Sequence, residues 1–351
     1  MLVVFQARYR FVSLLDRCSA GSAHINLPRE VGRVAINDVG TASDCERAAG
    51  QTIARMAIGE VAIRRCLACA RDFAESSWTC PFCGHEPTRL GGFVSFAPDL
   101  ALENSGLNPQ DHHVLERVQH SSFWFRARNR LLQDLALRWF RDAKSVLEVG
   151  CGTGYVLSGL REILPSARLA GSEIYVNGLE YAAKRLGDGV DLYQMDARAI
   201  PFSAEFDLIA ACDVLEHIEA DETVLREMHR ALRPGGGLLL TVPQHPFLWS
   251  HVDEVAFHKR RYGRTELQEK CRRNGFRVVA TTSFVSVLLP LMAIRRLTAA
   301  KRADYDAEAE MKLPRWLDRI LESVLDLERL LIARGGRLPL GGSRIVVAMR
   351  E

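Results

Sequence analysis

The sequence has little that would place the chain in a membrane or on a polyanion. Its 351 residues contain no apolar run of the ~20 residues that a membrane-spanning helix requires. Charge of one sign is also scarce, because 46 lysines and arginines face 43 aspartates and glutamates, which leaves a net charge of +3. Arg8 and Arg10 interrupt the apolar start of the chain, so a secretory signal core is missing as well. These absences predict a soluble, cytoplasmic protein in which any basic site is local.

A disulfide framework is also missing. The nine cysteines are an odd number, and four of them cluster within residues 66–83. The cluster consists of two C-x-x-C pairs: Cys66, Cys69, Cys80 and Cys83. Thiolates at this spacing close a tetrahedral Zn²⁺ site that has no open coordination position. We therefore predict a structural zinc ribbon over residues 61–97, with chance cysteines or a redox pair as the alternatives.

The first 60 residues carry no regular pattern. The chain as a whole has an ordinary globular composition, with 48% hydrophobic and 25% charged residues. Residues 1–60, however, mix glycine, serine and asparagine with isolated apolar pairs and show neither a helix nor a strand period. We predict a disordered leader there, and an alternative is that the natural chain starts at Met56.

From residue 145 onward, strand and helix patterns alternate. The predicted strands are 145–149, 168–172, 191–194, 207–211, 237–242, 277–282 and 343–350. The predicted helices are 154–164, 176–186, 221–232 and 264–274, after a long helical pattern over 112–140. Repeated βα units predict a parallel sheet covered by helices, with ligands at the carboxyl ends of its strands. The fold class is therefore α/β, a doubly wound Rossmann-like sheet over 110–351 with a helical insertion, 284–342, before the last strand.

A glycine-rich loop, EVGCGTG at residues 148–154, follows the first of these strands. Glycines at a strand–helix junction let the backbone approach a ligand and direct amide groups at it. The third small residue of the dinucleotide fingerprint G-x-G-x-x-G falls on Tyr155, and the P-loop pattern G-x-x-x-x-G-K-[ST] is missing. The loop instead has the form E-x-G-x-G-x-G.

This form resembles the first motif of the class I S-adenosylmethionine-dependent methyltransferases. Four further motifs follow in the order of that family: an acid after the second strand, MDA at 195–197, FDLIAACDVLEH at 206–217 and RPGGG at 233–237. The resemblance implies S-adenosylmethionine as the cofactor, bound by Glu148, Gly150, Cys151, Gly152, Gly154, Glu173, Asp196, Ala197, Cys212 and Arg128. The alternative is an NAD-binding domain, which also uses an acid near the position of Glu173.

The resemblance also implies a role for each part of this set. Glu173 would accept hydrogen bonds from the ribose hydroxyls, and Asp196 would accept one from the adenine amino group. In the segment FWFRARN at 123–129, Arg128 would meet the methionine carboxylate and Trp124 would shield the sulfonium. Plain packing of an amphipathic helix is the alternative for the aromatic residues.

The fourth-strand motif contains the candidate catalytic residues. Methyl transfer is an in-line displacement dominated by positioning, and a base is needed only for a hydroxyl acceptor. His217 is the candidate base and lies four residues after Asp213, which would orient the ring or bind substrate. The alternative is that His217 caps or packs beneath the loop. The Asn/Asp-Pro-Pro-Tyr pattern of amino-group methyltransferases is missing, which disfavours a nucleobase or amide nitrogen as acceptor.

Residues 243–262 (PQHPFLWSHVDEVAFHKRRY) resemble the acceptor-side segment of methyltransferases in which LWS, an Asp and H-x-R-R-Y precede a helix. Trp249 would form an apolar wall, and His258, Arg261 and Tyr262 would donate to an anionic or glycan-like group. A solvated basic turn is the alternative. The segment is too short and isolated to predict a nucleic-acid stripe.

The insertion and the whole pattern lead to a functional hypothesis. Residues 284–342 are interpreted as a helical cap or dimer interface, with a lid for a lipid-linked acceptor or peripheral membrane contact as the alternative.

We expect methyl transfer to a small-molecule acceptor, a hydroxyl on a saccharide or lipid-linked intermediate. The alternatives are an RNA methyltransferase that grips its substrate with the zinc ribbon, or a non-catalytic zinc- and cofactor-binding interaction module. The oligomeric state is left open.

Overall fold

The computed structural model describes residues 63–75, 77–102, 111–298 and 313–351. The predicted leader, and residues 299–312 of the predicted insertion, lie outside the described residues.

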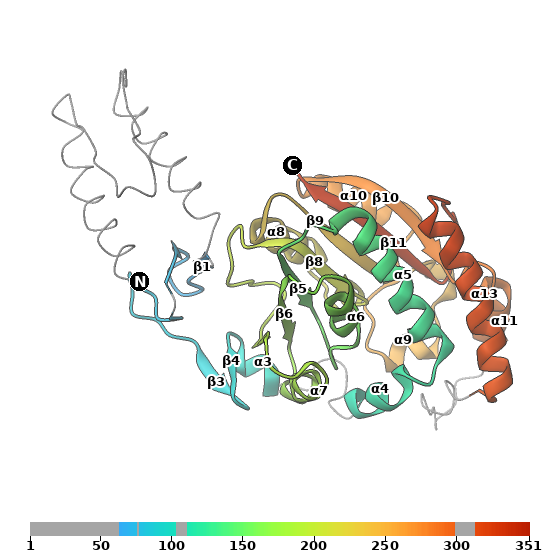
Figure 1. Cartoon of the computed structure of the whole chain (residues 1–351), viewed down its shortest axis with the longest axis horizontal. Helices are drawn as coiled ribbons and strands as arrows, with labels where there is room; N and C mark the ends of the chain where they lie inside the picture. The colour runs from blue at the N-terminus through green and yellow to red at the C-terminus, as the bar shows by residue number, and fades with distance from the viewer. Residues whose placement is uncertain (1–62, 76, 103–110, 299–312) are drawn as a thin grey trace, which may run out of the picture. The chain divides into compact units, whose positions relative to one another are not determined.

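A nine-stranded sheet in the order β10-β11-β9-β8-β5-β6-β7-β4-β3 carries the fold (Figure 1). Its parallel part consists of β5 (Ser145–Val149), β6 (Arg168–Glu173), β7 (Val190–Gln194), β8 (Phe206–Cys212) and β9 (Leu232–Pro243). At one edge, β11 (Ser343–Arg350) runs antiparallel to both β9 and β10 (Phe276–Phe284). Every residue of β5 is buried, as expected for a central strand covered on both faces.

Helices cover both faces of the sheet and form two separate apolar cores. One core contains residues of α5 (Phe123–Phe140), α6 (Tyr155–Ile163), α7 (Val176–Leu186) and α13 (Arg315–Ala333). The other contains residues of α8 (Asp221–Ala231) and α10 (Glu266–Arg273). Four short helices complete the described part: α3 (Pro98–Leu102), α4 (Asp111–Gln119), α9 (His251–Val255) and α11 (Leu289–Thr298). This arrangement confirms the predicted doubly wound α/β class.

Two local features differ from the pattern expected from sequence. The long helical pattern at 112–140 is interrupted, because Ser122 has an extended backbone and separates α4 from α5. The RPGGG segment, expected as a turn, lies within β9, where the pairing with β8 shifts register and Gly235 has a φ of +79°. The glycine allows this left-handed position, so the segment is a bulge at the start of the strand.

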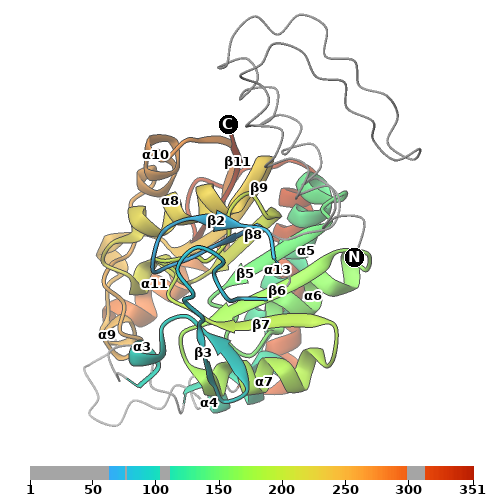
Figure 2. The same cartoon turned by 90° about the vertical axis from the view of Figure 1, so that its left-hand side faces the viewer.

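An N-terminal hairpin extends the sheet beyond β7 (Figure 2). It consists of β3 (Thr88–Leu90) and β4 (Phe93–Ser95), which lie within the range predicted as zinc ribbon. β4 pairs in parallel with β7, and the Ser95 hydroxyl donates to Oε1 of Gln194 at 2.7 Å. The cysteine pairs lie just before this hairpin, with a two-stranded sheet of β1 (Arg64–Arg65) and β2 (Asp72–Phe73).

The insertion places α13 alongside α5. Ion pairs join the two helices at successive turns: Arg126–Asp318, Arg126–Glu322, Arg130–Glu322, Arg130–Asp326 and Arg329–Asp134. Residue numbers rise together on both helices, so the two run parallel. Within the part of the chain that the structure describes, no helix is long and apolar enough to cross a membrane.

Candidate functional site

The loop between β5 and α6 has the backbone geometry of a ligand-binding turn. Gly150, Gly152 and Gly154 have φ values of +68°, +50° and +74°, a left-handed region that favours glycine. A Cβ atom on Gly150 would lie only 2.5 Å from a methyl carbon of Val214. The loop leads into α6 at the carboxyl edge of the sheet, where helix-terminal amides face a ligand.

Glu173, at the end of β6, is locked against this loop. Its Oε2 accepts a hydrogen bond from the Gly152 amide at 3.0 Å, and its Oε1 accepts one from the Ile174 amide at 2.8 Å. The residue is 9% exposed. The structure therefore brings the two leading cofactor-binding predictions, the glycine loop and Glu173, into direct contact.

Helix α4 lies next to the same loop, a contact that the sequence analysis missed. His112 is buried, and its Cδ2 is 4.0 Å from where a Cβ of Gly152 would stand. Its Nδ1 has no hydrogen-bond partner among the described residues. Gln119, at the end of α4, accepts a hydrogen bond from the Thr153 hydroxyl at 2.6 Å. Nothing in the residue pattern predicts these contacts beyond a helical period that begins at His112.

Arg128 of α5 reaches the ends of β8 and β9. Its Nη2 lies 2.6 Å from Oδ2 of Asp213 and donates to the Thr241 hydroxyl at 3.0 Å. Its guanidinium carbon lies 4.9 Å from the centroid of the Trp124 ring, within cation–π distance. Asp213 has a left-handed φ of +59°, an uncommon conformation for a residue other than glycine. The predicted pair of Arg128 and Trp124 is therefore assembled beside the predicted catalytic Asp213.

Glu148, at the end of β5, is a buried acid whose charge is only partly compensated. Burial raises the pKa of Glu148 to about 8, against the opposing effect of Arg128. Oε2 of Glu148 and Nε of Arg128 are buried and have no hydrogen-bond partner in the described part of the chain. Most buried polar atoms in folded proteins are hydrogen-bonded, so this pair marks a place where a polar ligand fits.

The remaining predicted cofactor residues lie around the same edge. Cys151 and Ala197 are both buried, and burial raises the pKa of the Cys212 thiol. Asp196, just after β7, pairs with the guanidinium of Arg198 at 2.9 Å and accepts a hydrogen bond from the Arg198 amide.

His217 lies in a short 3₁₀ turn, η2 (Leu215–His217), directly after β8. Burial lowers the pKa of His217 to about 4, so the ring is neutral at pH 7. The ring contacts that of His258, with centroids 4.8 Å apart. Asp213, which was expected to orient His217 or to bind substrate, pairs with Arg128 and accepts a hydrogen bond from the Thr241 hydroxyl.

A buried carboxylate, Asp253, organises the segment expected to meet the acceptor. Its oxygens contact Nδ1 of His258 at 2.9 Å, Nε of Arg261 at 2.7 Å and Nη1 of Arg296 at 2.8 Å. These contacts hold the pKa of Asp253 well below its usual range, although burial opposes them. Asp253 also caps α9, because it accepts a hydrogen bond from the Ser250 amide.

Two residues expected to donate to an acceptor use their donors inside the protein. Arg261 is 6% exposed and bonds Asp253 and the Gln244 carbonyl. Tyr262 is fully buried and its hydroxyl donates to Asp221 at 2.7 Å. Arg261 and Tyr262 therefore stabilise the segment from inside the protein, and their expected role as donors to an acceptor is corrected. Trp249, the expected apolar wall, is 39% exposed.

Comparison with known proteins agrees with this geometry. Residues 147–240, from β5 into β9, match a family described as a methyltransferase domain. Residues 147–240 thus form a domain that is similar to S-adenosylmethionine-dependent methyltransferases.

The relatives of this chain differ in the acceptor that their names state. It is 26% identical over 114 residues to the malonyl-[acyl-carrier protein] O-methyltransferase of Priestia megaterium, covering 32% of this chain and 42% of that one. It is 30% identical over 127 residues to the ubiquinone/menaquinone biosynthesis C-methyltransferase UbiE of Hahella chejuensis, covering 33% and 51%. A protein of Mycolicibacterium smegmatis named "Probable S-adenosylmethionine-dependent methyltransferase" is 28% identical over 187 residues, covering 52% and 70%. The chain thus spans about half the length of the first two relatives, and their names disagree on the acceptor atom.

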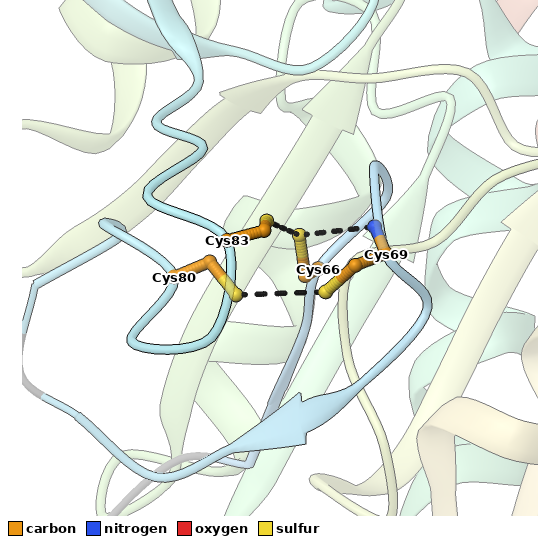
Figure 3. Close-up of side chains that lie close together, drawn as sticks. All are labelled: Cys66, Cys69, Cys80 and Cys83. Carbon is orange, nitrogen blue, oxygen red and sulfur yellow. Dashed lines mark hydrogen bonds between the residues drawn. The ribbon is translucent and has the colours of Figure 1, made fainter.

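The four clustered cysteines of the chain face one point (Figure 3). Sγ of Cys66 lies 3.6 Å from Sγ of Cys83, and Sγ of Cys69 lies 3.7 Å from Sγ of Cys80. Zn–S bonds of ~2.3 Å in a tetrahedral site place neighbouring sulfurs about 3.8 Å apart. A disulfide would instead require sulfurs ~2.05 Å apart. The donor set and the spacing therefore fit a tetrahedral metal ion and not two disulfides.

Trp78 docks this cysteine module on the sheet. Its ring makes edge contacts with Phe96, Tyr193 and Phe202 at centroid distances of 4.7, 5.6 and 5.5 Å. The guanidinium of Arg64 also stacks on the Trp78 ring, with its carbon 4.2 Å from the ring centroid. The module is thus fixed beside β7 and the segment that precedes β8.

Proposed function

We propose that this methyltransferase transfers the methyl group of S-adenosylmethionine to an oxygen atom of a small-molecule acceptor. One observation carries the proposal: buried polar atoms without partners surround the left-handed glycine loop. Among the described residues these are Oε2 of Glu148, Nε of Arg128 and Nδ1 of His112. Such atoms cost free energy unless a ligand satisfies them.

The unpartnered atoms suit the chemistry of this cofactor. The amino-acid end of S-adenosylmethionine carries an ammonium group, which can donate hydrogen bonds to the carboxylate of Glu148. It also carries a carboxylate, which the guanidinium of Arg128 can bind. Glu173 stands beside the glycine loop, where it can accept hydrogen bonds from ribose hydroxyls. When bound, S-adenosylmethionine supplies an electrophilic methyl group on sulfur. Asp213 acts as a positioning residue, because it holds the guanidinium of Arg128.

The acceptor side of the site favours oxygen chemistry. The ring of His217 is neutral at pH 7, so one of its nitrogens keeps a lone pair that can accept a proton. The ring of His258 lies next to it. Neutral imidazoles bind protons or metal ions and suit the activation of a hydroxyl.

An apolar surface beside this edge supports an acceptor with a lipid portion. Arg296 of α11 donates to the Ser250 hydroxyl at 2.9 Å, which ties α11 to the acceptor-side segment. Large apolar side chains on these elements are exposed by 60% or more: Phe247, Val287, Leu291 and Ile294. Exposed apolar groups gathered in this way are typical of binding surfaces, and they favour a lipid-linked hydroxyl, with a saccharide hydroxyl as the second candidate.

We also propose that the four cysteines bind a structural Zn²⁺ ion. All four sulfurs lie within 4.8 Å of one another, which leaves no coordination position for a substrate. The ion would stabilise a module whose own core consists of Phe73 and three of the four cysteines, Cys66, Cys69 and Cys80.

The test is to incubate the full chain with S-adenosyl-[methyl-³H]methionine and a total lipid extract, an aqueous metabolite extract or total RNA, each from the source cells. The proposal predicts base-labile or ether-linked label in the lipid or the aqueous fraction, with release of S-adenosylhomocysteine. Label in RNA alone would favour the alternative in which the zinc module grips RNA. Tight cofactor binding without label in any fraction would favour a non-catalytic interaction module.

A further inference from the structure

Three side chains next to the cofactor edge converge on one point. Glu216, His217 and His258 each offer a ligand atom, and these atoms all lie within 4.8 Å of one another. Glu216 and His217 belong to the 3₁₀ turn after β8, while His258 follows α9. The protein chain therefore folds two distant segments together to form this cluster.

Glu216 has an unusual environment for a carboxylate. It is 0% exposed, and neither of its oxygens accepts a hydrogen bond from another described residue. Burying an unpaired carboxylate is strongly unfavourable, so such groups in folded proteins are paired or coordinate a metal ion. The fold holds this side chain in place without supplying a partner of its own.

One histidine of the cluster is oriented through its second ring nitrogen. Nδ1 of His258 lies 2.9 Å from Oδ1 of Asp253, which Arg261 and Arg296 hold in turn. The ring of His217 packs edge-on against that of His258, with centroids 4.8 Å apart. A histidine that donates one N–H to a carboxylate or carbonyl, and keeps the other nitrogen free, is the usual arrangement around a bound metal ion.

We propose that Glu216, His217 and His258 bind a divalent first-row transition-metal ion such as Mn²⁺ or Fe²⁺. Two imidazole nitrogens and one carboxylate suit such ions and leave coordination positions open, unlike the four cysteines. The open positions fit an acceptor that offers two neighbouring oxygens, for example a catechol, a vicinal diol or a hydroxyl beside a carbonyl group.

The chemical role of the ion rests on the proposed function, whereas its binding does not. A hydroxyl bound to the ion becomes more acidic and loses its proton to water. The oxygen electron pair then forms the new C–O bond, and the C–S bond of the methyl donor breaks with its electron pair left on sulfur. In this scheme His217 is a metal ligand and not the general base expected from sequence.

The test measures Mn²⁺ binding to the full chain by electron paramagnetic resonance, with the zinc content per chain determined in parallel. Mn²⁺ prefers oxygen and nitrogen ligands, so the cysteine site does not compete for it. We expect one Mn²⁺ per chain, with at least tenfold weaker binding in both E216Q and H258A. H251A, which changes a histidine of α9 outside the cluster, serves as the matched control and should bind as the wild type does.

A thermal readout makes the result independent of activity. Mn²⁺ should raise the Tm of the wild-type chain and leave that of E216Q unchanged, and E216Q without metal should have a Tm close to that of the metal-free wild type, because an amide replaces an unpartnered buried carboxyl group of nearly the same size. No Mn²⁺ binding by the wild type, or unchanged binding by E216Q and H258A, would overturn the proposal. Titration of the same samples with S-adenosylmethionine separates the two claims. Binding of S-adenosylmethionine without binding of Mn²⁺ rejects only the metal site. Binding of Mn²⁺ without binding of S-adenosylmethionine rejects only the proposed function.

Discussion

The cysteine cluster and the carboxyl edge of the sheet are both built to hold ligands, but they differ in how complete they are. At the cysteines, four sulfurs of one kind converge on one point at distances that suit a tetrahedral ion. At the carboxyl edge, acids and bases are buried with atoms left unpartnered in the described structure, notably on Glu148, Arg128 and Glu216.

The difference separates a site that stabilises a fold from a site that binds and releases ligands. A closed site contributes its binding free energy to folding, because the ion is always present. An open site costs stability in the empty protein and regains it on binding, which is a common trade between activity and stability. Substitutions should therefore act on folding in the first region and on affinity in the second.

The largest effect is expected from breaking the closed site with Cys80→Ser. Losing one of four thiolates should reduce zinc from one ion per chain to nearly none, because structural zinc sites owe about 10 kcal/mol or more of apparent binding free energy to the complete set. Hydrogen exchange should then become fast in residues 63–97, while the affinity for S-adenosylmethionine changes less than about threefold. Thr79→Ser, an exposed neighbour, is the control. Retained zinc in Cys80→Ser would contradict the closed four-thiolate site.

The next effect is expected from Glu173→Ala at the open site. Hydrogen bonds to a charged group contribute about 1.5–3 kcal/mol each, so losing two of them should weaken S-adenosylmethionine binding about 100-fold or more. Zinc content should stay the same. Glu180→Ala removes an exposed carboxylate from the neighbouring helix α7 and should leave the affinity unchanged. Calorimetric titration measures both variants, and equal affinities would remove Glu173 from the site.

Binding of S-adenosylmethionine should release the proton that Glu148 carries in the empty protein. Its pKa of about 8 means that it is mostly protonated at pH 7, and an ammonium group bound beside it should favour the ionised form. Titrations at pH 7 in buffers of different ionisation enthalpy should show nearly one proton released in the wild type and none in Glu148→Gln. Equal proton release in the two would contradict this placement of the cofactor.

The same shift predicts how stability depends on pH. The pKa of Glu148 in the folded protein lies above the ~4.3 of an unfolded glutamate, so the folded state binds the proton more tightly. Its stabilising contribution is complete below pH ~4 and is lost as the pH rises through 8. The decline in the free energy of unfolding between these values should be smaller in Glu148→Gln.

The smallest effect is expected where every charge already has a partner. Arg130→Ala removes one member of the ion pairs between α5 and α13, whose side chains are partly exposed. Exposed ion pairs contribute about 0–1 kcal/mol, so urea denaturation should show a loss in that range. Cofactor affinity should be unchanged, and a tenfold loss would show that α13 is coupled to the open site.

Most of the fold could be predicted because its signals are local. β5 and β11 have the predicted bounds, and α7 has the bounds of the predicted helix. Buried strands and amphipathic helices can be recognised from the period of their hydrophobic residues. The hairpin that extends the sheet could not be predicted, because β4 pairs with β7 across about a hundred residues of chain. Short strands carry too little pattern to reveal such a partner.

The site could be predicted only where residue type implies contact. The glycine loop and Glu173 meet as the resemblance implied, although their roles remain predictions. Arg261 and Tyr262 looked like donors to an acceptor, but Asp253 and Asp221 use those donors in the interior. The identity of a residue does not reveal its burial, and for the same reason the buried, unpartnered state of Glu216 is visible only in three dimensions.

Titration calorimetry of the zinc-loaded wild-type chain with S-adenosylmethionine, and separately with NAD, tests the central claim most directly. We expect one S-adenosylmethionine bound per chain with a micromolar Kd or tighter, and no heat of binding with NAD. Binding of NAD, or no binding of S-adenosylmethionine by the folded, zinc-loaded protein, would contradict the claim that the unpartnered atoms around the glycine loop form the cofactor site.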